Sequence, residues 1–231
     1  MPIDDGPLPE GDDKVTAVRD MFDTIAPRYD MVNRIMTFRL DVRWRRRAVA
    51  ALDLDFGSSV ADLACGTGDF CEDLVAAGYR PIGFDISAGM LEAARTAEPL
   101  VQADILRLPV PDHTFDGATC GYALRNVVDL AAFFDELGRT VRSGGRVALL
   151  DVSEPANPIL RAGHRVYFGR VVPLIGGLLS DRSAYRYLPR SAAYLPPADE
   201  MIAMLAASGF TAVTHREMTG GLSQLLSATR S

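Results

Sequence analysis

A glycine-rich turn directly after a short apolar run is the feature that most restricts how this chain can fold. The run occupies residues 58–65, and Gly66-Thr67-Gly68 follows it at the start of a helical pattern. Glycines let the backbone approach a ligand closely, and a helix N-terminus favours an anionic group. Asp85 closes the next apolar run, where a carboxylate can accept hydrogen bonds from two ribose hydroxyls. The pattern predicts a nucleoside-binding edge on a strand–turn–helix unit.

Short apolar runs and helical patterns alternate through the middle of the chain. The alternation predicts an α/β fold, in which a parallel sheet has helices on both faces. The carboxyl ends of such strands share one edge, where these sheets bind ligands. Two further strands near the C-terminus are close enough in sequence to pair as a hairpin. The expected strands occupy residues 58–65, 80–87, 99–105, 114–124, 144–153, 211–217 and 222–228, and expected helices occupy 90–97, 130–141 and 199–208.

Three segments fall outside this alternation. Residues 1–13 are acidic and rich in proline and glycine, so we expect a disordered leader. Apolar residues at helical spacing predict a helical cap over residues 14–51, with a break at Pro27. Residues 155–190 are apolar and carry several arginines, prolines and glycines, and we interpret them as a helical insert after the fifth strand. Residues 14–231 then form one domain, which suits a chain of 231 residues.

Charge and cysteine content exclude several classes of protein. The net charge of −6 argues against nucleic-acid binding. The three cysteines are scattered, lie at no zinc-ligand spacing from the histidines and predict neither disulfides nor a metal site. The N-terminus lacks the basic and apolar regions of a signal peptide, and no run of about 18 apolar residues exists. We therefore expect a cytoplasmic protein with free thiols.

Two cofactors suit a glycine turn of this kind. A dinucleotide needs a third glycine where this chain has Cys71, so the fingerprint of a nicotinamide oxidoreductase is broken. S-adenosylmethionine carries no pyrophosphate and needs only the first tight turn. Asp62, at the end of the first run, suits its positive charge, and Asp104 lies where a carboxylate can accept from the adenine amino group. The alternative is a fortuitous turn of the same shape in another doubly wound enzyme.

Longer motifs carry a resemblance to a known family. The chain resembles the ubiquinone/menaquinone biosynthesis C-methyltransferases from about residue 18 to residue 228, and most closely the actinobacterial demethylmenaquinone methyltransferases. The resemblance implies a class I, Rossmann-like methyltransferase fold: a seven-stranded, mostly parallel sheet with an antiparallel last strand. It also implies S-adenosylmethionine-dependent C-methylation of a prenylated quinol, from demethylmenaquinol to menaquinol. The motifs that carry it are residues 22–44, 62–70, 123–129, 144–155 and 185–191.

The resemblance also assigns cofactor contacts to individual positions. With the glycine turn and Asp62, the expected cofactor-binding residues are Asp62, Gly66, Thr67, Gly68, Asp85, Asp104, Ile105 and Gly121. Three positions depart from the family pattern. A serine is common where this chain has Gly121, and histidines are usual where it has Asp41 and Leu226. These departures leave a second acceptor open, a soluble small molecule or polyketide methylated by an enzyme of the same fold.

Ring methylation requires an acceptor whose carbon has been made nucleophilic by loss of an adjacent hydroxyl proton. A phenol has a pKa of about 10, so its anion at pH 7 costs about 4 kcal/mol, which a base or a positive field can offset. We expect Asp151 or Asp30 to act as the base and Arg125 to stabilise the oxyanion. The alternative is a buried network of Tyr29, Asp30 and Arg125 that ties the cap to the sheet. The expected substrate-binding residues are Tyr29, Asn33, Asn126, Tyr185 and Tyr187.

The expected partner is a prenylated quinol. The apolar stretch 171–179 suits a prenyl tail or the surface of a bilayer, although a packed cap over the core explains it equally well. Arg43, Arg45, Arg46 and Arg47 form either a membrane-surface patch or a solvated helix face. We expect peripheral contact with the inner face of a membrane, and the resemblance allows a homodimer. A non-catalytic scaffold that binds the cofactor structurally is the third class of function to separate.

Overall fold

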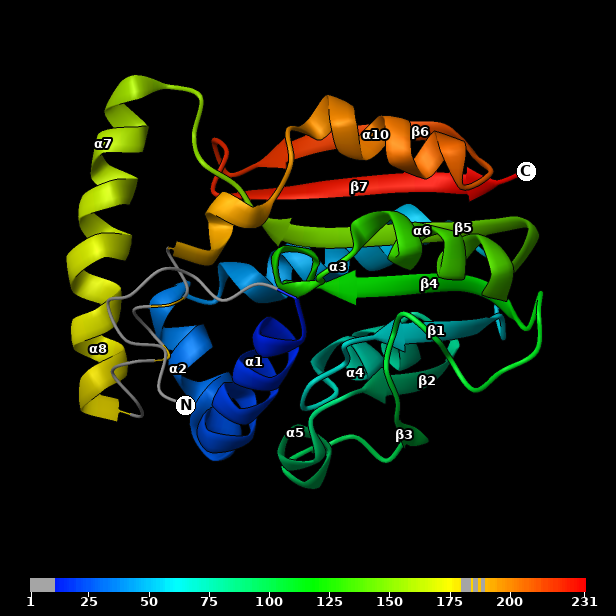
Figure 1. The fold of residues 1–231 in the computed structure, drawn as a ribbon, viewed down its shortest axis with the longest axis horizontal. Helices are drawn as coiled ribbons and strands as arrows, with labels where there is room; N and C mark the ends of the chain where they lie inside the picture. The colour runs from blue at the N-terminus through cyan, green and yellow to red at the C-terminus, as the bar shows by residue number, and fades with distance from the viewer. Residues whose placement is uncertain (1–10, 180–183, 185–186, 188–189) are drawn as a thin grey trace.

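The chain folds around one seven-stranded sheet, seen in a computed structural model that describes residues 11–179, 184, 187 and 190–231 (Figure 1). The strand order is β3-β2-β1-β4-β5-β7-β6. Neighbours among β1 to β5 pair in parallel, and β7 pairs antiparallel with both β5 and β6. The predicted sheet is therefore confirmed. The strands are β1 Ser59–Leu63, β2 Arg80–Asp85, β3 Leu100–Gln102, β4 Phe115–Gly121, β5 Val141–Val152, β6 Phe210–Met218 and β7 Ser223–Arg230.

Strand β1 lies at the point where the strand order reverses. The chain moves outward from β1 to β2 and β3, and then returns to place β4 on the other side of β1. Helices on opposite faces diverge at such a point, and ligands bind outside the carboxyl ends of the strands there. The glycine turn follows β1 directly, so the fold positions it at this crevice.

Helices cover both faces of the sheet. One face packs on α6 (Leu130–Thr140) and α10 (Ala198–Ala207), through a cluster that includes Phe133 and Leu205. The other face packs on α3 (Leu40–Leu52) and α4 (Asp69–Ala76), through a cluster that includes Trp44 and Leu74. Both clusters consist largely of fully buried side chains, so the strands are apolar on both sides.

The predicted helical cap is confirmed. It consists of α1 (Gly11–Ile25), a 3₁₀ turn (Ala26–Arg28), α2 (Tyr29–Met36) and α3. Because α1 begins at Gly11, the predicted disordered leader is wrong for residues 11–13, and residues 1–10 lie outside the described part of the chain.

The helix expected over residues 90–97 is shorter and begins earlier. Helix α5 spans Ala88–Glu92, because the Ser87 hydroxyl caps it by accepting from the Met90 amide at 3.1 Å. The chain then leaves the helix, and the Arg95 amide donates to the Thr67 carbonyl at 3.2 Å. The residues beyond α5 thus support the glycine turn.

The described part of the predicted insert is helical from Pro158 onward, and residues 155–157 lead into it without helical structure. Asn157 caps α7 (Pro158–Val166), which continues through a π-helical turn (Tyr167–Val171) into α8 (Val172–Leu179). Figure 1 shows these helices as one rod along the side of the molecule, beyond the carboxyl ends of β4 and β5. A third apolar cluster joins this rod to α1 and α2, and it includes Met36, Val172 and Tyr187. Among the described helices, none has the length and apolarity needed to cross a bilayer.

Candidate cofactor and acceptor site

The glycine turn is held in an uncommon backbone conformation. Ala64, Gly66 and Gly68 all have positive φ, of 53°, 56° and 87°. A Cβ on Gly68 would collide with the Thr96 side chain, whereas a Cβ on Gly66 would meet no protein atom within 4 Å. Gly66 therefore faces open space, as a ligand cradle requires. Gly68 lines neither cavity described below and packs against Thr96, so its contact with the cofactor stays a prediction.

Asp85 ends β2 directly beside this turn. Its two carboxylate oxygens accept from the amides of Gly66 at 2.7 Å and Ser87 at 2.8 Å. Burial raises the pKa of this carboxyl, and the backbone amides act in the opposite direction. The parallel pairing of β1 with β2 brings Gly66 and Asp85 together, as the sequence predicted.

A small cavity of about 130 Å³ opens beside Asp85. Asp104 and Ile105 lie on its wall together with Gly66 and Gly121, so the structure brings together five of the predicted cofactor residues. The remaining lining is mainly apolar and comes from α1, α5 and the segments after β3 and β4. It includes Val18, Phe22, Met90, Leu106 and Val127.

A larger cavity of about 1040 Å³ lies between the sheet edge, the cap and the insert. Both cavities touch Gly66, Gly121 and Tyr29, so they meet at the end of β1. The large cavity also contains the predicted residues Asp30, Asn33, Thr67 and Arg125. On the side of the insert its wall is formed by Leu160, His164, Tyr167 and Phe168.

The residues present fit S-adenosylmethionine. The small cavity offers apolar walls for a purine, Asp104 for its amino group and Asp85 for a ribose diol. The open space at Gly66 leads from there into the large cavity. A ligand that extends from one cavity into the other would place its far end beside the acceptor space.

Phe70 explains why a glycine occupies position 121, where the two cavities meet. A Cβ at position 121 would overlap the Phe70 ring. Phe70 is buried and packs with α3 and α4. The departure from the serine that is common in the family therefore accompanies a bulky ring on α4.

Arg125 and Asp151 form a buried ion pair. The guanidinium is 3% exposed, the carboxylate is fully buried, and the Arg125 Nε also donates to Ser191 Oγ at 3.1 Å. Asp151 further accepts from the amides of Arg125 at 3.1 Å and Val152 at 2.7 Å. Asp151 lines neither cavity. Arg125 and backbone amides occupy its oxygens, so its role as base stays a prediction that the geometry does not favour.

Asp30 lies in the large cavity, as predicted. It is 6% exposed and accepts from the Thr67 hydroxyl at 2.6 Å, which ties α2 to the glycine turn. The expected alternative is a network of Tyr29, Asp30 and Arg125. In the structure Asp30 instead accepts from Thr67, and Arg125 donates to Asp151. Burial raises the pKa of Tyr29, whereas the nearby Arg125 lowers it.

The remaining predicted substrate residues separate. Asn126 lines the small cavity and accepts from the Tyr187 hydroxyl at 3.1 Å. Tyr187 is 1% exposed and lines neither cavity, so it supports Asn126, and its own contact with a substrate stays a prediction. Tyr185 lies outside the described residues.

Lys14 is a buried residue near the site that the sequence did not identify. Its ammonium donates to the carbonyls of Arg125 at 3.0 Å and Val127 at 3.2 Å, and it lies 3.7 Å from the ring centroid of Tyr194. Burial lowers the pKa of Lys14 to about 8. Helix α1 thereby holds the segment that carries Arg125. In the sequence, nothing distinguishes this lysine from a solvated one.

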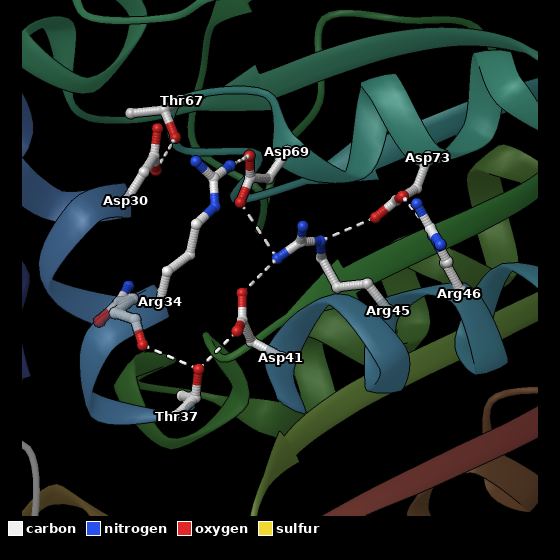
Figure 2. A network of polar contacts seen from close by, with 10 residues as sticks. Asp30, Arg34, Thr37, Asp41, Arg45, Arg46, Thr67, Asp69 and Asp73 are labelled. Atoms are coloured by element: carbon white, nitrogen blue, oxygen red, sulfur yellow. Dashed lines mark hydrogen bonds and ion pairs between the residues drawn. The ribbon is translucent and has the colours of Figure 1, made fainter. Parts of the chain in front are cut away.

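A second ionic network joins the cap to α4 (Figure 2). Arg45 lies at its centre and pairs with Asp41 at 3.0 Å, Asp69 at 3.0 Å and Asp73 at 2.9 Å. Arg34 from α2 adds a second contact to Asp69 at 2.8 Å. Asp69 is the first residue of α4, directly after the glycine turn. Of the arginines in residues 43–47, Arg45 is thus buried, and its neighbours Arg43, Arg46 and Arg47 are exposed.

Asp62 faces away from both cavities. It is 1% exposed and accepts from Thr119 Oγ1 at 2.9 Å and from the Cys71 thiol at 3.5 Å. It lines neither cavity, so its contact with the cofactor stays a prediction that these cavities do not support. The Asp62 carboxylate is instead hydrogen-bonded to Thr119 on the neighbouring strand β4.

This burial makes the stability of the fold depend on pH. Burial raises the pKa of Asp62 from 3.8 to about 7, so the folded state holds a proton that the unfolded state has lost between these values. The stabilisation is complete below pH 3.8 and is lost as the pH rises through about 7. Between about pH 6 and pH 8.5 this group alone should lower the free energy of unfolding by about 1.4 kcal/mol. Asp62→Asn should remove this difference in the free energy of unfolding between the two pH values, as measured by denaturant unfolding at each. An equal difference in both proteins would contradict the assignment.

Comparisons with known proteins agree with this geometry. The profile of the ubiE/COQ5 methyltransferase family matches residues 10–230. The ubiquinone/menaquinone biosynthesis C-methyltransferase UbiE of Syntrophotalea carbinolica is 42% identical over 222 residues, which cover 92% of this chain and 94% of that protein. The demethylmenaquinone methyltransferase of Roseiflexus sp. is 42% identical over 220 residues, which cover 90% and 91%. The family resemblance is thus confirmed, and its actinobacterial branch stays a prediction.

Solved structures with the same fold are more distant in sequence. Phosphoethanolamine N-methyltransferase 2 of Haemonchus contortus, in complex with S-adenosyl-L-methionine, has a TM-score of 0.65 at 12% identity. That alignment covers 92% of this chain and 59% of that one. A possible histamine N-methyltransferase of Thermotoga maritima has a TM-score of 0.61 at 18% identity and covers 92% and 99%. At such identities these likenesses show the class I methyltransferase fold alone.

Proposed function

The chain belongs to the ubiE/COQ5 methyltransferase family, and we propose that its acceptor is a prenylated quinol, demethylmenaquinol, which it converts to menaquinol. The reaction is S-adenosylmethionine-dependent C-methylation in quinone biosynthesis. One observation supports the assignment most strongly: a small cavity beside Asp85 opens into a much larger, mainly apolar cavity at Gly66 and Gly121.

In this proposal the bound cofactor supplies an electrophilic methyl group, and the protein's own residues prepare the acceptor. Arg125 lies in the large cavity with a buried positive charge, which stabilises an oxyanion on the quinol ring. Asp30 is the remaining candidate for the base, because it lies in the same cavity and Asp151 does not. Tyr29 and Asn33, one turn apart on α2, form the wall that orients the ring.

A prenylated acceptor is a lipid, so we also propose that the protein works in peripheral contact with a membrane. The apolar wall that α7 and α8 add to the large cavity supports a route for the prenyl tail. The homodimer allowed by the family resemblance stays a prediction, which light scattering would test.

The alternative acceptor is a soluble small molecule or polyketide. Asp41 favours it, because this residue lines the large cavity at a position where the family usually has histidine. Leu226 carries no weight in this choice, since it is fully buried in the core and lines neither cavity.

Incubation with S-adenosylmethionine and a reduced demethylmenaquinone that carries a short prenyl tail tests the proposal. We expect mass spectrometry to find a quinol heavier by one methyl group. Asp85→Ala should abolish both the product and cofactor binding in calorimetry, because it removes the carboxylate that orders the turn at Gly66. Cofactor binding without any methylated quinol would exclude this acceptor in favour of a soluble one. Only weak cofactor binding by the unaltered protein, with no methylated product, would favour the non-catalytic scaffold.

A further inference from the structure

The solvent side of the insert carries large apolar side chains with no protein cover. Ile159, Val166 and Leu174 are 81%, 55% and 62% exposed. Val166 and Leu174 line neither cavity, whereas Ile159 also lines the large one. They are seven and eight residues apart, which is two turns each, so they follow one side of the continuous rod formed by α7, the π-helical turn and α8. We call these three side chains the outer insert face. Isolated exposed apolar residues are common, but a row of them on one helix indicates a contact surface.

The end of α2 continues this surface. Phe38 is 75% exposed, and its ring centroid lies 6.0 Å from that of Tyr167 in the π-helical turn. The Tyr167 hydroxyl donates to the Met36 carbonyl at 2.7 Å, which fixes the rod against α2. Phe38 also has a positive φ of 51°, so the turn that exposes this ring is held in a conformation uncommon for such a residue.

The charge around the face is positive, although the whole chain carries −6. Residues 154–179 contain three arginines and one acid, Glu154, which pairs with Arg165 at 2.9 Å. Arg170 lies on the rod and is exposed, and Arg39 is exposed beside Phe38. An apolar helix side bordered by arginines suits the boundary between acyl chains and anionic headgroups.

The opposite side of the same rod lines the large cavity. Leu160, His164, Tyr167 and Phe168 face that cavity, so the thickness of one helix, about 10 Å, separates the cavity from Val166 and Leu174. Ile159 and Phe38 are exposed and also line the cavity, so the two surfaces meet there. A bilayer in contact with the outer face would lie next to the acceptor space. A lipid tail could then pass beneath the rod without crossing bulk water.

We propose that the outer insert face, with Phe38 and Arg170, docks this protein reversibly on anionic bilayers. The identity of the cargo rests on the proposed function, but the docking itself does not require it. The apolar side chains enter the acyl boundary, and the arginines remain with the headgroups. This surface would set where a lipid acceptor enters the enzyme.

Co-sedimentation with vesicles tests the docking without any quinol. We expect the protein to bind phosphatidylglycerol-containing vesicles at low salt and to bind phosphatidylcholine vesicles much more weakly. Val166→Ser/Leu174→Ser should weaken binding at least about tenfold, because both side chains lose apolar contact and neither lines a cavity. Arg170→Glu should weaken it by a similar factor, and Arg170→Lys should not.

Phe56→Ser is the matched control. Phe56 is 90% exposed, but it precedes β1 and so lies at the opposite end of the sheet, and its loss should leave vesicle binding unchanged. Activity on a short-tailed acceptor without vesicles should be the same for all these variants.

Failure of the unaltered protein to bind anionic vesicles would overturn the docking, and so would equal binding to neutral vesicles. A change of oligomeric state in the double variant without lipid would overturn it in favour of a contact between copies. Methylation without vesicle binding would leave the proposed function standing, and vesicle binding without methylation would leave the docking standing.

Discussion

Arg125→Met combined with Asp151→Asn is expected to lower the turnover of the quinol by a factor of about 10² to 10³. Arg125 brings a buried positive charge next to the acceptor space, and methionine keeps much of its volume without that charge. Asparagine at position 151 is needed because Arg125→Met alone would leave the Asp151 carboxylate buried without its cation. That loss typically destabilises a protein by about 3–5 kcal/mol. Affinity for S-adenosylmethionine should change little, since neither residue lines the small cavity.

The pH dependence of the rate separates an electrostatic role from a structural one. If Arg125 stabilises the quinol oxyanion, its loss should return the acceptor hydroxyl toward its ordinary pKa of about 10. The rate of the double variant should then rise about tenfold per pH unit well above neutrality, where the unaltered enzyme has levelled off. Arg125→Lys, which keeps the charge, should recover part of the rate. A double variant with the unaltered pH profile and a merely reduced rate would assign Arg125 to the support of the loop.

The sheet and the cofactor edge were predictable because their signals are local in the sequence. Gly66 and Asp85 each end a strand, and parallel pairing of consecutive strands brings such positions together whatever surrounds them. Asp104 and Ile105 follow the third strand in the same way. The glycine turn required no knowledge of the cap or the insert.

The direction in which a carboxylate points was not predictable in the same way. Strands covered by helices on both faces are apolar throughout, so the pattern around Asp62 does not reveal which side it faces. Hydrogen bonds from Thr119 and Cys71 fix the direction of the Asp62 carboxylate, and these donors reach it only after β4 and α4 have packed. Asp151 ends β5 at the correct edge, but Arg125 covers it.

Contacts between the cap and the sheet depend on tertiary packing alone. Arg45 and Arg46 are neighbours in one run of arginines, yet their side chains are 8% and 73% exposed. Which of them is buried depends on the side of α3 that meets α4. The same holds for Lys14, whose partners are more than 100 residues away in the sequence.

Arg45→Met is expected to lower the free energy of unfolding by about 3–5 kcal/mol, the largest loss of stability expected from a single change in the cap. Burial lowers the pKa of the guanidinium, but Asp69, Asp73 and Asp41 raise it further, so Arg45 stays charged and balances three carboxylates. Without it, Asp41 would be left 3% exposed with only the Thr37 hydroxyl as a donor, at 2.5 Å. Denaturant unfolding of both proteins measures the difference.

Two neighbouring arginines provide matched controls, because they contact the same acids with more exposure to water. Arg34 also pairs with Asp69, at 34% exposure, and Arg46 pairs with Asp73 at 3.5 Å and 73% exposure. Solvent screens such pairs, so Arg34→Met and Arg46→Met should each cost about 0–1 kcal/mol. Arg45→Met/Asp41→Leu should recover part of the loss, since it removes the most buried of the unpaired charges. Equal small effects for all three arginines would mean that the cap is held by its apolar contacts, and that Arg45 only neutralises charge at the start of α4.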